Sequence, residues 1–130
     1  MTDFVWVQED AILAVHDRLL AVHGGAAGIR DRGLLDSAMA RPQNLAAYGS
    51  PDVFQLAAAY ASGIVHNHPF VDGNKRAGFM AAFIFLSRNG SDLSASELEA
   101  TRTMLSLAAG ETSEEQLAVW LGENCFRIEP

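Results

Sequence analysis

The chain has 130 residues, of which 49% are hydrophobic and 19% charged, a composition typical of globular rather than disordered proteins. The net charge is −7, and lysines and arginines cluster only around residue 75, which argues against a surface for duplex nucleic acid. With one cysteine, Cys125, the chain has no internal disulfide and no cysteine-built zinc site.

The length predicts one domain spanning residues 1–130. The longest apolar run, residues 77–86, is about half as long as a bilayer-spanning helix requires, so we expect no membrane segment. No basic segment followed by an apolar one opens the sequence, so we expect no signal peptide either. Together with the single cysteine, these features favour the cytoplasm.

Apolar residues recur at helical spacing along most of the chain, which predicts an all-α bundle of about six helices. After a short apolar segment at residues 4–7, expected to be extended, the helices are expected at residues 8–23, 31–41, 51–67 and 74–88, from 94 to before 110, and from 112 onward. Pro42 is expected to stop the second helix. The fourth helix carries large apolar residues on nearly every face, which predicts a buried central helix: Phe79, Met80, Phe83, Ile84 and Leu86.

Local signals predict where several helices begin and end. Ser50 followed by Pro51 is typical of a helix start, with serine as the cap. The pairs Ser94–Glu97 and Thr112–Glu115 match the capping box of the fifth and sixth helices. Asn89-Gly90 predicts a left-handed end to the fourth.

The segment IVHNHPFVDGNKRAGFMAAFIF, residues 64–85, places a dense polar stretch between two apolar runs. Pro69 disfavours helical angles at His68, so the third helix should end near Asn67, and a short loop should lead through Gly73 into the fourth. The N-terminus of a helix has unpaired N–H groups and partial positive charge, which makes it a binding site for anions. Gly73 would let a ligand approach closely.

Lys75 and Arg76 fall in the first helical turn, where cations are unfavourable. A bound phosphate would remove the conflict, because the helix dipole and both side chains would then face one negative charge. The alternative is that both side chains reach into solvent. The pattern favours a phosphate site made by Gly73, Asn74, Lys75 and Arg76.

The remaining polar residues of the loop have candidate roles in catalysis. Asp72 suits Mg²⁺ as an oxygen ligand, or else caps the fourth helix. Asn74 would orient phosphates or the loop itself. Histidine is the commonest general base in enzymes, so His68 is the candidate for that role, with a structural role as the alternative. Phe70 is expected to point inward and to anchor the loop.

Other interpretations of the histidines have weaker support. His66, His68 and Asp72 suggest a transition-metal hydrolase, but no fourth ligand is evident. The letters H-N-H do not indicate the nuclease fold of that name, because the histidines and asparagine of that fold are dispersed over two strands and a helix. The sequence also has no Walker motif for nucleotide phosphates. His16 and His23 are interpreted as structural or solvent-facing.

The nine residues HPFVDGNKR, 68–76, resemble the signature of the Fic superfamily, H-P-F-x-[D/E]-G-N-x-R, and more closely its death-on-curing (Doc) branch. The segments GIRDRGLLDSAMARP and FLSRNG also resemble that family, so the resemblance covers about residues 4–90. It implies a small, all-α toxin of a bacterial toxin–antitoxin pair that uses ATP and Mg²⁺ to modify a protein hydroxyl. It further implies that His68 deprotonates this hydroxyl, that Asp72 binds Mg²⁺, and that Gly73, Asn74 and Arg76 hold phosphates.

Two departures from the superfamily pattern bear on the reaction. Adenylyl-transferring members resemble this chain except that they have glycine in place of Lys75 and a second arginine in place of Phe79. The Doc branch shares both departures and transfers the γ-phosphate, its target being a threonine of translation elongation factor Tu, which halts protein synthesis. The resemblance therefore implies a kinase, with adenylyl transfer or a non-catalytic module that binds nucleotide or antitoxin as alternatives.

The inhibitory motif of the superfamily, [S/T]-x-x-x-E-[G/N], has no match in the sequence. The resemblance then implies restraint by a cognate antitoxin whose flexible tail folds onto this domain. No direct nucleic-acid or membrane partner is expected. Arg30, Arg32 and Arg41 precede the motif and either line the site or serve structural roles.

Overall fold

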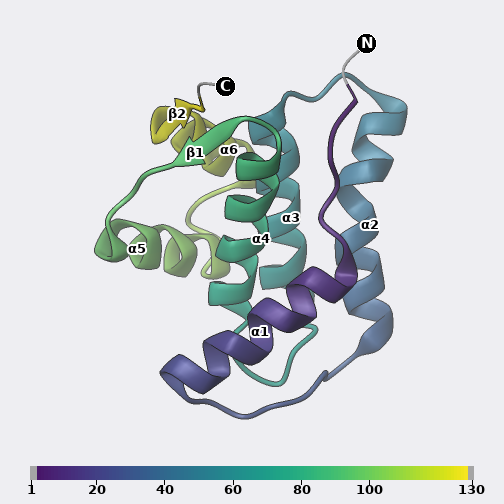
Figure 1. The fold of residues 1–130 in the computed structure, drawn as a ribbon, viewed down its shortest axis with the longest axis vertical. Helices are drawn as coiled ribbons and strands as arrows, with labels where there is room; N and C mark the ends of the chain where they lie inside the picture. The colour runs from purple at the N-terminus through teal and green to yellow at the C-terminus, as the bar shows by residue number, and fades with distance from the viewer. Residues whose placement is uncertain (1–2, 129–130) are drawn as a thin grey trace.

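Six helices and one small sheet make up residues 3–128, the part of the chain that the computed structural model describes (Figure 1). In chain order these are α1 (Glu9–His23), α2 (Arg32–Tyr48), α3 (Val53–Asn67), α4 (Asn74–Arg88), β1 (Ser91–Leu93), α5 (Glu97–Ala108), α6 (Glu114–Glu123) and β2 (Cys125–Arg127). The all-α prediction is confirmed, and the short sheet is an addition that it did not include. Within the described residues, no helix is both long enough and apolar enough to cross a bilayer.

The antiparallel pair α3 and α4 occupies the centre of the bundle (Figure 1). Helices α2 and α6 pack against α3, α1 and β1 pack against α4, and α5 packs against both central helices. Every residue of α3 from Leu56 to Val65 is buried, so this helix is the most enclosed. The prediction of a central helix after the motif is confirmed, but its buried face is built mainly from small residues: Asn74, Ala77, Gly78, Ala81, Ala82, Phe85 and Leu86.

Small residues bring the backbones of the central helices close together. A Cβ atom added to Gly78 of α4 would lie 2.9 Å from Val65 Cγ2 and 3.1 Å from the carbonyl oxygen of Ala61. On the other side of α3, a Cβ on Gly63 would lie 3.3 Å from the Cα of Ala38 in α2. Because such contacts leave no room for a methyl group, α3 is held tightly between its two neighbours. The large apolar residues expected at the centre of α4, such as Phe79 and Phe83, are only half-buried.

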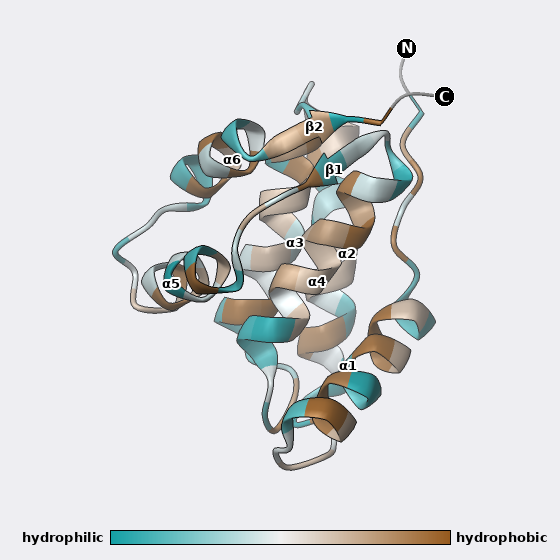
Figure 2. Cartoon of the chain, turned by 60° about the vertical axis from the view of Figure 1, so that its left-hand side comes forward, coloured by the Kyte–Doolittle hydropathy of each residue, from teal (hydrophilic) through white to brown (hydrophobic). Residues whose placement is uncertain are grey.

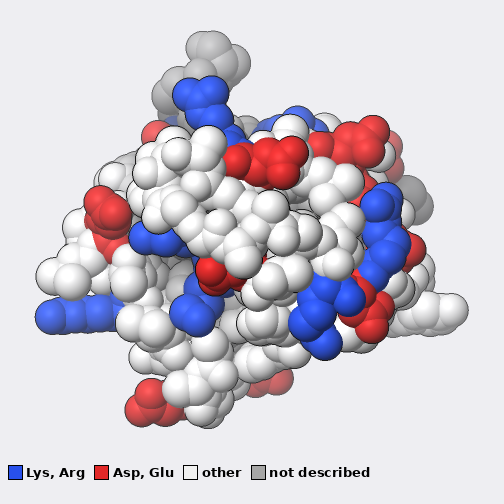
Figure 3. All heavy atoms as spheres, turned by 90° about the horizontal axis from the view of Figure 1, so that it is seen from below, with Lys and Arg blue, Asp and Glu red and all other residues white. Residues whose placement is uncertain are grey.

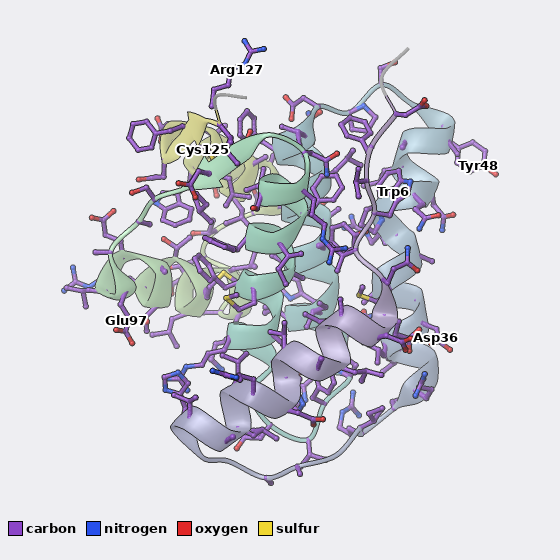
Figure 4. All side chains as sticks on the ribbon, in the orientation of Figure 1. Trp6, Asp36, Tyr48, Glu97, Cys125 and Arg127 are labelled. Carbon is purple, nitrogen blue, oxygen red and sulfur yellow. The ribbon has the colours of Figure 1, made fainter. Side chains whose placement is uncertain are left out.

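Residues 3–8, before α1, form neither helix nor strand and are held by side chains of α3, of α4 and of the residue that follows α4. Val7 N–H donates to the hydroxyl of Tyr60 over 3.0 Å. The side chain of Asn89 bonds both backbone groups of Val5, at 2.8 and 2.9 Å. The indole of Trp6 stacks on Phe85, with ring centroids 5.7 Å apart (Figure 4). Aromatic burial therefore fixes a segment that lacks regular structure.

The expectation that Pro42 stops the second helix is wrong. Helix α2 continues to Tyr48, with Pro42 buried inside it. Proline removes one backbone hydrogen bond from a helix, but a ring packed in the core and a half-buried Ala46 beyond it offset that loss. Tertiary packing here outweighs the local rule.

Three expected helix starts are also wrong, each by one or two residues. The caps are Asp52, Ser96 and Ser113 in place of Ser50, Ser94 and Thr112. Asp52 and Ser113 form capping boxes with Gln55 and Gln116, because glutamine serves at the third helical position as well as glutamate does. At the end of α4, the left-handed residue is Gly90, with φ 90°, whereas Asn89 has φ −111°.

Strands β1 and β2 pair antiparallel at the end of the bundle opposite the motif loop (Figure 1). Ser91 pairs with Arg127 and Leu93 with Cys125. Each strand has three residues, too few for the period of two to be visible in the sequence. The sheet thus joins the segment after α4 to the C-terminal segment without contributing to the loop.

Candidate functional site

The motif loop connects the central helices at the end of the bundle where α1 crosses (Figure 1). Helix α3 ends at Asn67, and α4 begins at Asn74, as the sequence predicts. Helices α3 and α4 are mostly apolar, whereas the start of α4 is hydrophilic (Figure 2). The polar residues of the motif therefore lie on the most buried framework of the molecule, which restricts their movement.

Phe70 and Asn74 give the loop its shape. The Phe70 side chain is fully buried, as predicted. Asn74 is also buried, and its Oδ1 accepts from Phe70 N–H at 3.0 Å while its Nδ2 donates to the Phe70 carbonyl at 2.9 Å. Of the two roles considered for the Asn74 side chain, orienting the loop is the one that these bonds perform. Phosphate binding by Asn74 stays a prediction, for which its backbone N–H at the start of α4 is the available group.

His68 ends α3 in an unusual backbone conformation. Its φ of 53° and ψ of 54° are left-handed, and no other described residue except glycine has a positive φ. A residue before proline avoids right-handed helical angles, and His68 does so while its N–H still bonds Ile64 O over 3.0 Å. The side chain is exposed. Such strain, about 1–3 kcal/mol, is concentrated at functional sites in proteins.

Arg30 holds this helix end from outside. Its Nε donates to the carbonyl of His68 at 2.7 Å, and a terminal nitrogen donates to the carbonyl of Asn67 at 2.9 Å. A guanidinium at a helix C-terminus pairs with unbonded carbonyls and with the negative end of the dipole. The sequence left two roles open for Arg30, lining the site or a structural role. Its contacts to the backbone of the candidate base give it the structural role.

The segment that carries Arg30 runs along the motif loop. Arg30 and Asp31 donate their backbone N–H groups to the Pro69 carbonyl at 2.6 and 3.1 Å, and Val71 N–H donates to Gly28 O at 3.0 Å. Ile29 and Phe70 form an isolated antiparallel bridge. These main-chain bonds join residues 28–31 to the loop, so two segments distant in sequence form one structural unit.

We expect Arg30→Ala to lower kcat for the modification of a protein hydroxyl, which the motif implies, by roughly 10- to 100-fold, because small misplacements of a catalytic group are costly. Arg30→Lys should recover little, since one ammonium group cannot bond two carbonyls in the geometry of a guanidinium. Arg32→Ala is the matched control, because Arg32 forms exposed ion pairs with Glu9 and Asp36 at 2.9 and 3.6 Å. A wild-type kcat in Arg30→Ala would contradict the positioning role.

Asp72 is held by main-chain N–H groups. Its Oδ1 accepts from Gly73 N–H at 2.9 Å and its Oδ2 from Ala26 N–H at 3.3 Å. These bonds, with Lys75 nearby, keep the pKa of the Asp72 carboxyl below its ordinary value. The alternative in which Asp72 caps α4 is wrong, because Gly73 occupies that position with φ 79° and no side chain caps the helix. The carboxylate is therefore ionised at neutral pH and exposed to solvent.

Lys75 and Arg76 extend from the first turn of α4 and are exposed. Together with Asp72, Gly73 and Asn74 they line a cavity of about 530 Å³ between α1, α4 and α5. The walls beyond the motif are largely apolar and include Leu19, Phe79, Met80, Ala100, Met104 and Leu105. Five of the six predicted site residues thus share one cavity, whereas His68 does not line it. A cavity with one cationic end and apolar walls suits a ligand with a phosphate group and an apolar ring.

The other candidate residues lie apart from this cavity. Arg41 pairs with Glu114 beside a second cavity, of about 590 Å³, which contains no motif residue. His66 is exposed in the last turn of α3. Among residues 3–128, no three histidine, cysteine or acidic side chains are placed to hold a metal ion, which leaves the transition-metal interpretation without support.

Residues of other helices also reach the motif, and the sequence carries no local signal for them. His16 is buried, as a structural histidine would be, but it contacts the loop directly. The exposed His23 of α1 and, on α5, Glu97 and Thr101 line the cavity. Their distance from the motif along the chain left no local signal of this proximity.

The charges around this end of the molecule are mixed. Seen from the end that carries α1, Lys and Arg side chains form separate groups with Asp and Glu side chains between them (Figure 3). On this view of residues 3–128 there is no continuous basic surface. The local positive charge at the start of α4 thus suits a small anion better than a nucleic-acid backbone.

Comparison with known proteins agrees with the motif. The model of the Fic/DOC family matches residues 6–86. The chain is 47% identical to "Toxin Doc" of Mycolicibacterium smegmatis over 75 residues, which cover 55% of this chain and 57% of that protein. It is 32% identical to "Protein kinase doc" of Escherichia phage P1 over 113 residues, 86% of this chain and 89% of that one.

Proposed function

The chain belongs to the Fic/Doc family, in its Doc branch, and on that premise we propose that it is a toxin that transfers the γ-phosphate of ATP to a hydroxyl group of a target protein. The relative from phage P1 is named a protein kinase and the mycobacterial one a toxin. The proposed target is translation elongation factor Tu in the cytoplasm, which would stop protein synthesis. The proposed catalytic unit is the single domain of residues 1–130.

The arrangement of the motif supports phosphoryl transfer. His68 would take the proton of the target hydroxyl, whose oxygen then bonds the γ-phosphorus while the bond from that phosphorus to the ADP oxygen breaks. Lys75, Arg76 and the uncapped N–H groups of α4 would bind the phosphate oxygens. Such transfer depends on positioning and charge stabilisation more than on covalent chemistry. The buried α3–α4 pair would supply the positioning, and the two cations with the N–H groups of α4 would supply the charge stabilisation.

The donor set also fits a magnesium ion. The ionised Asp72 is the one carboxylate of the motif, and it borders the cavity that Lys75 and Arg76 line. Oxygen ligands of this kind suit Mg²⁺, which is bound through one or two carboxylates plus phosphates. Bound there, Mg²⁺ would neutralise part of the negative charge of the triphosphate. Asp72 would hold it with an orientation set by Gly73 and Ala26 N–H.

One observation carries the choice of kinase over adenylyl transferase: Lys75 and Phe79 line the same cavity. They are four residues apart and thus on one face of α4. Adenylyl-transferring members of the superfamily have glycine and arginine at these two places. In this chain Phe79 replaces the second arginine, which holds the outer phosphates in the adenylyl-transferring members. Lys75 replaces their glycine and puts a cation where those enzymes have no side chain.

The proposal predicts which phosphate is transferred. In a bacterial translation extract with the purified protein, we expect protein labelling from ATP labelled at the γ-phosphorus and none from ATP labelled at the α-phosphorus. Chelation of Mg²⁺ should abolish labelling, and mass spectrometry should locate phosphate on a threonine of elongation factor Tu. The double variant Lys75→Gly/Phe79→Arg should lose γ-label transfer. Label from the α position alone would replace the kinase with an adenylyl transferase.

A cognate antitoxin is the proposed partner, because the chain has no match to the inhibitory motif of the superfamily. An active enzyme of this kind needs restraint from another chain. A short reading frame beside its gene, whose product binds this protein and prevents labelling in the extract, is the expected source.

A further inference from the structure

His16 is a buried polar side chain in direct contact with the motif loop, although it lies more than fifty positions earlier in the chain. It is 3% exposed, on the face of α1 that packs against α4. Its Nε2 lies 2.7 Å from the carbonyl oxygen of Asp72. A carbonyl can only accept, so this contact requires a proton on Nε2.

The same ring also fixes the loop anchor. The imidazole of His16 stacks on the ring of Phe70, with centroids 3.8 Å apart and planes 10° apart. Phe70 is in turn fully buried and bonded through its backbone to Asn74. A Cβ added to Gly73 would lie 3.4 Å from His16 Nε2, so the loop packs on the ring edge as well as on its face.

Contacts to Asp72 converge from two sides. His16 holds its carbonyl, while Ala26 and Gly73 N–H groups hold its carboxylate. Ala26 approaches only because its neighbour is glycine: Gly25 has φ 119°, and a Cβ there would lie 2.8 Å from Asp72 Oδ2. The carboxylate therefore has a defined direction before any ligand binds, and His16 is the one side chain among these three donors.

We propose that His16 is a positioning residue that fixes the main chain of Asp72 so that its carboxylate meets the metal ion of a nucleotide in a set direction. This inference rests on the proposed function, in which Asp72 holds Mg²⁺. A histidine that only filled the core would be replaceable by another aromatic ring. The hydrogen bond from Nε2 to Asp72 predicts that it is not, because groups that orient metal ligands affect metal affinity directly.

The test separates the ring from its N–H group. His16→Phe keeps the stacking on Phe70 and loses the donor, whereas His16→Gln keeps a donor at similar reach and loses the ring. Isothermal titration of ATP with and without Mg²⁺ should show a roughly tenfold weaker metal-dependent affinity in His16→Phe, unchanged metal-free binding, and recovery of most of the metal-dependent affinity in His16→Gln. His66→Phe, an exposed histidine outside the site, is the matched control.

Two results would overturn the proposal: a wild-type Mg²⁺ effect in His16→Phe, or equal losses in both His16 variants. Should the variants unfold, ¹⁵N spectra of the wild-type imidazoles decide, since His16 must be the Nε2–H tautomer and an Nδ1–H tautomer would refute the contact. If the wild type binds no ATP at all, the proposed function fails, and the same spectra still judge whether His16 holds Asp72.

Discussion

Replacing His68 with alanine is expected to lower the rate of γ-phosphate transfer by about 10²- to 10⁴-fold, the usual contribution of a general base. The fold should survive, because the structural bonds of this residue come from its backbone: its N–H to Ile64 and its carbonyl to Arg30. Labelling kinetics with elongation factor Tu, paired with circular dichroism and urea unfolding, measure both properties. His66→Ala, an exposed histidine two positions earlier, should change neither.

A glycine at the same position sharpens this test. His68 has φ 53°, a region that glycine enters without steric cost. His68→Gly should therefore be as inactive as the alanine variant, yet up to about 1 kcal/mol more stable than that variant. Activity that remained in either variant would remove His68 from the catalytic role. Unfolding of both would instead show that its side chain has a structural function.

The second large effect is expected at Asn74. Asn74→Ala should lower the free energy of unfolding by more than about 2 kcal/mol, because two buried backbone groups of Phe70 would each lose a partner worth roughly 1–3 kcal/mol. Nucleotide affinity should fall with it, since the loop that presents Asp72 and the start of α4 would lose its shape. Urea unfolding and ATP titration on the same preparation measure the two effects.

Controls at other positions isolate the cause. Asn44→Ala removes an exposed asparagine from α2 and should change stability by less than about 0.5 kcal/mol. Asn74→Asp keeps an acceptor for Phe70 N–H but places a buried carboxylate oxygen against the Phe70 carbonyl, so a loss at least as large as that of the alanine variant is expected. If Asn74→Ala kept wild-type stability and lost only ATP affinity, its side chain would be a direct phosphate ligand instead.

The sequence predicts α4 at its observed bounds because its signals are local and agree. Gly73 precedes its first turn, and Gly90 supplies the left-handed residue after its last. Where two neighbouring polar residues competed for a cap, as Ser94 and Ser96 do, the sequence offered no way to choose between them. The prediction that Pro42 ends α2 was wrong for another reason. Proline does cost the helix a hydrogen bond, but the core packing that offsets this loss comes from residues of other helices.

The residues of the candidate site could be predicted because they are contiguous in the sequence, from His68 to Arg76. What the sequence did not reveal is how those residues are held. Arg30 and His16 each reach the loop through contacts that only the folded chain creates, and nothing in their local pattern distinguishes them from surface or core residues. The α5 wall of the cavity depends on the packing of that helix against α4, which no periodicity specifies.

The close contact of α3 with α4 has a consequence for how this protein could diversify. His68 follows the end of α3, and Lys75 lies in the first turn of α4. Gly78 of α4 lies against the backbone of Ala61 in α3, with no side chain between them to adjust the spacing. The proposed proton acceptor and the proposed phosphate-binding cations are therefore expected to keep a fixed spacing. Changes of target during evolution would then arise in α5 and in residues 24–31, which surround these residues, while the backbone spacing of the α3–α4 pair stays the same.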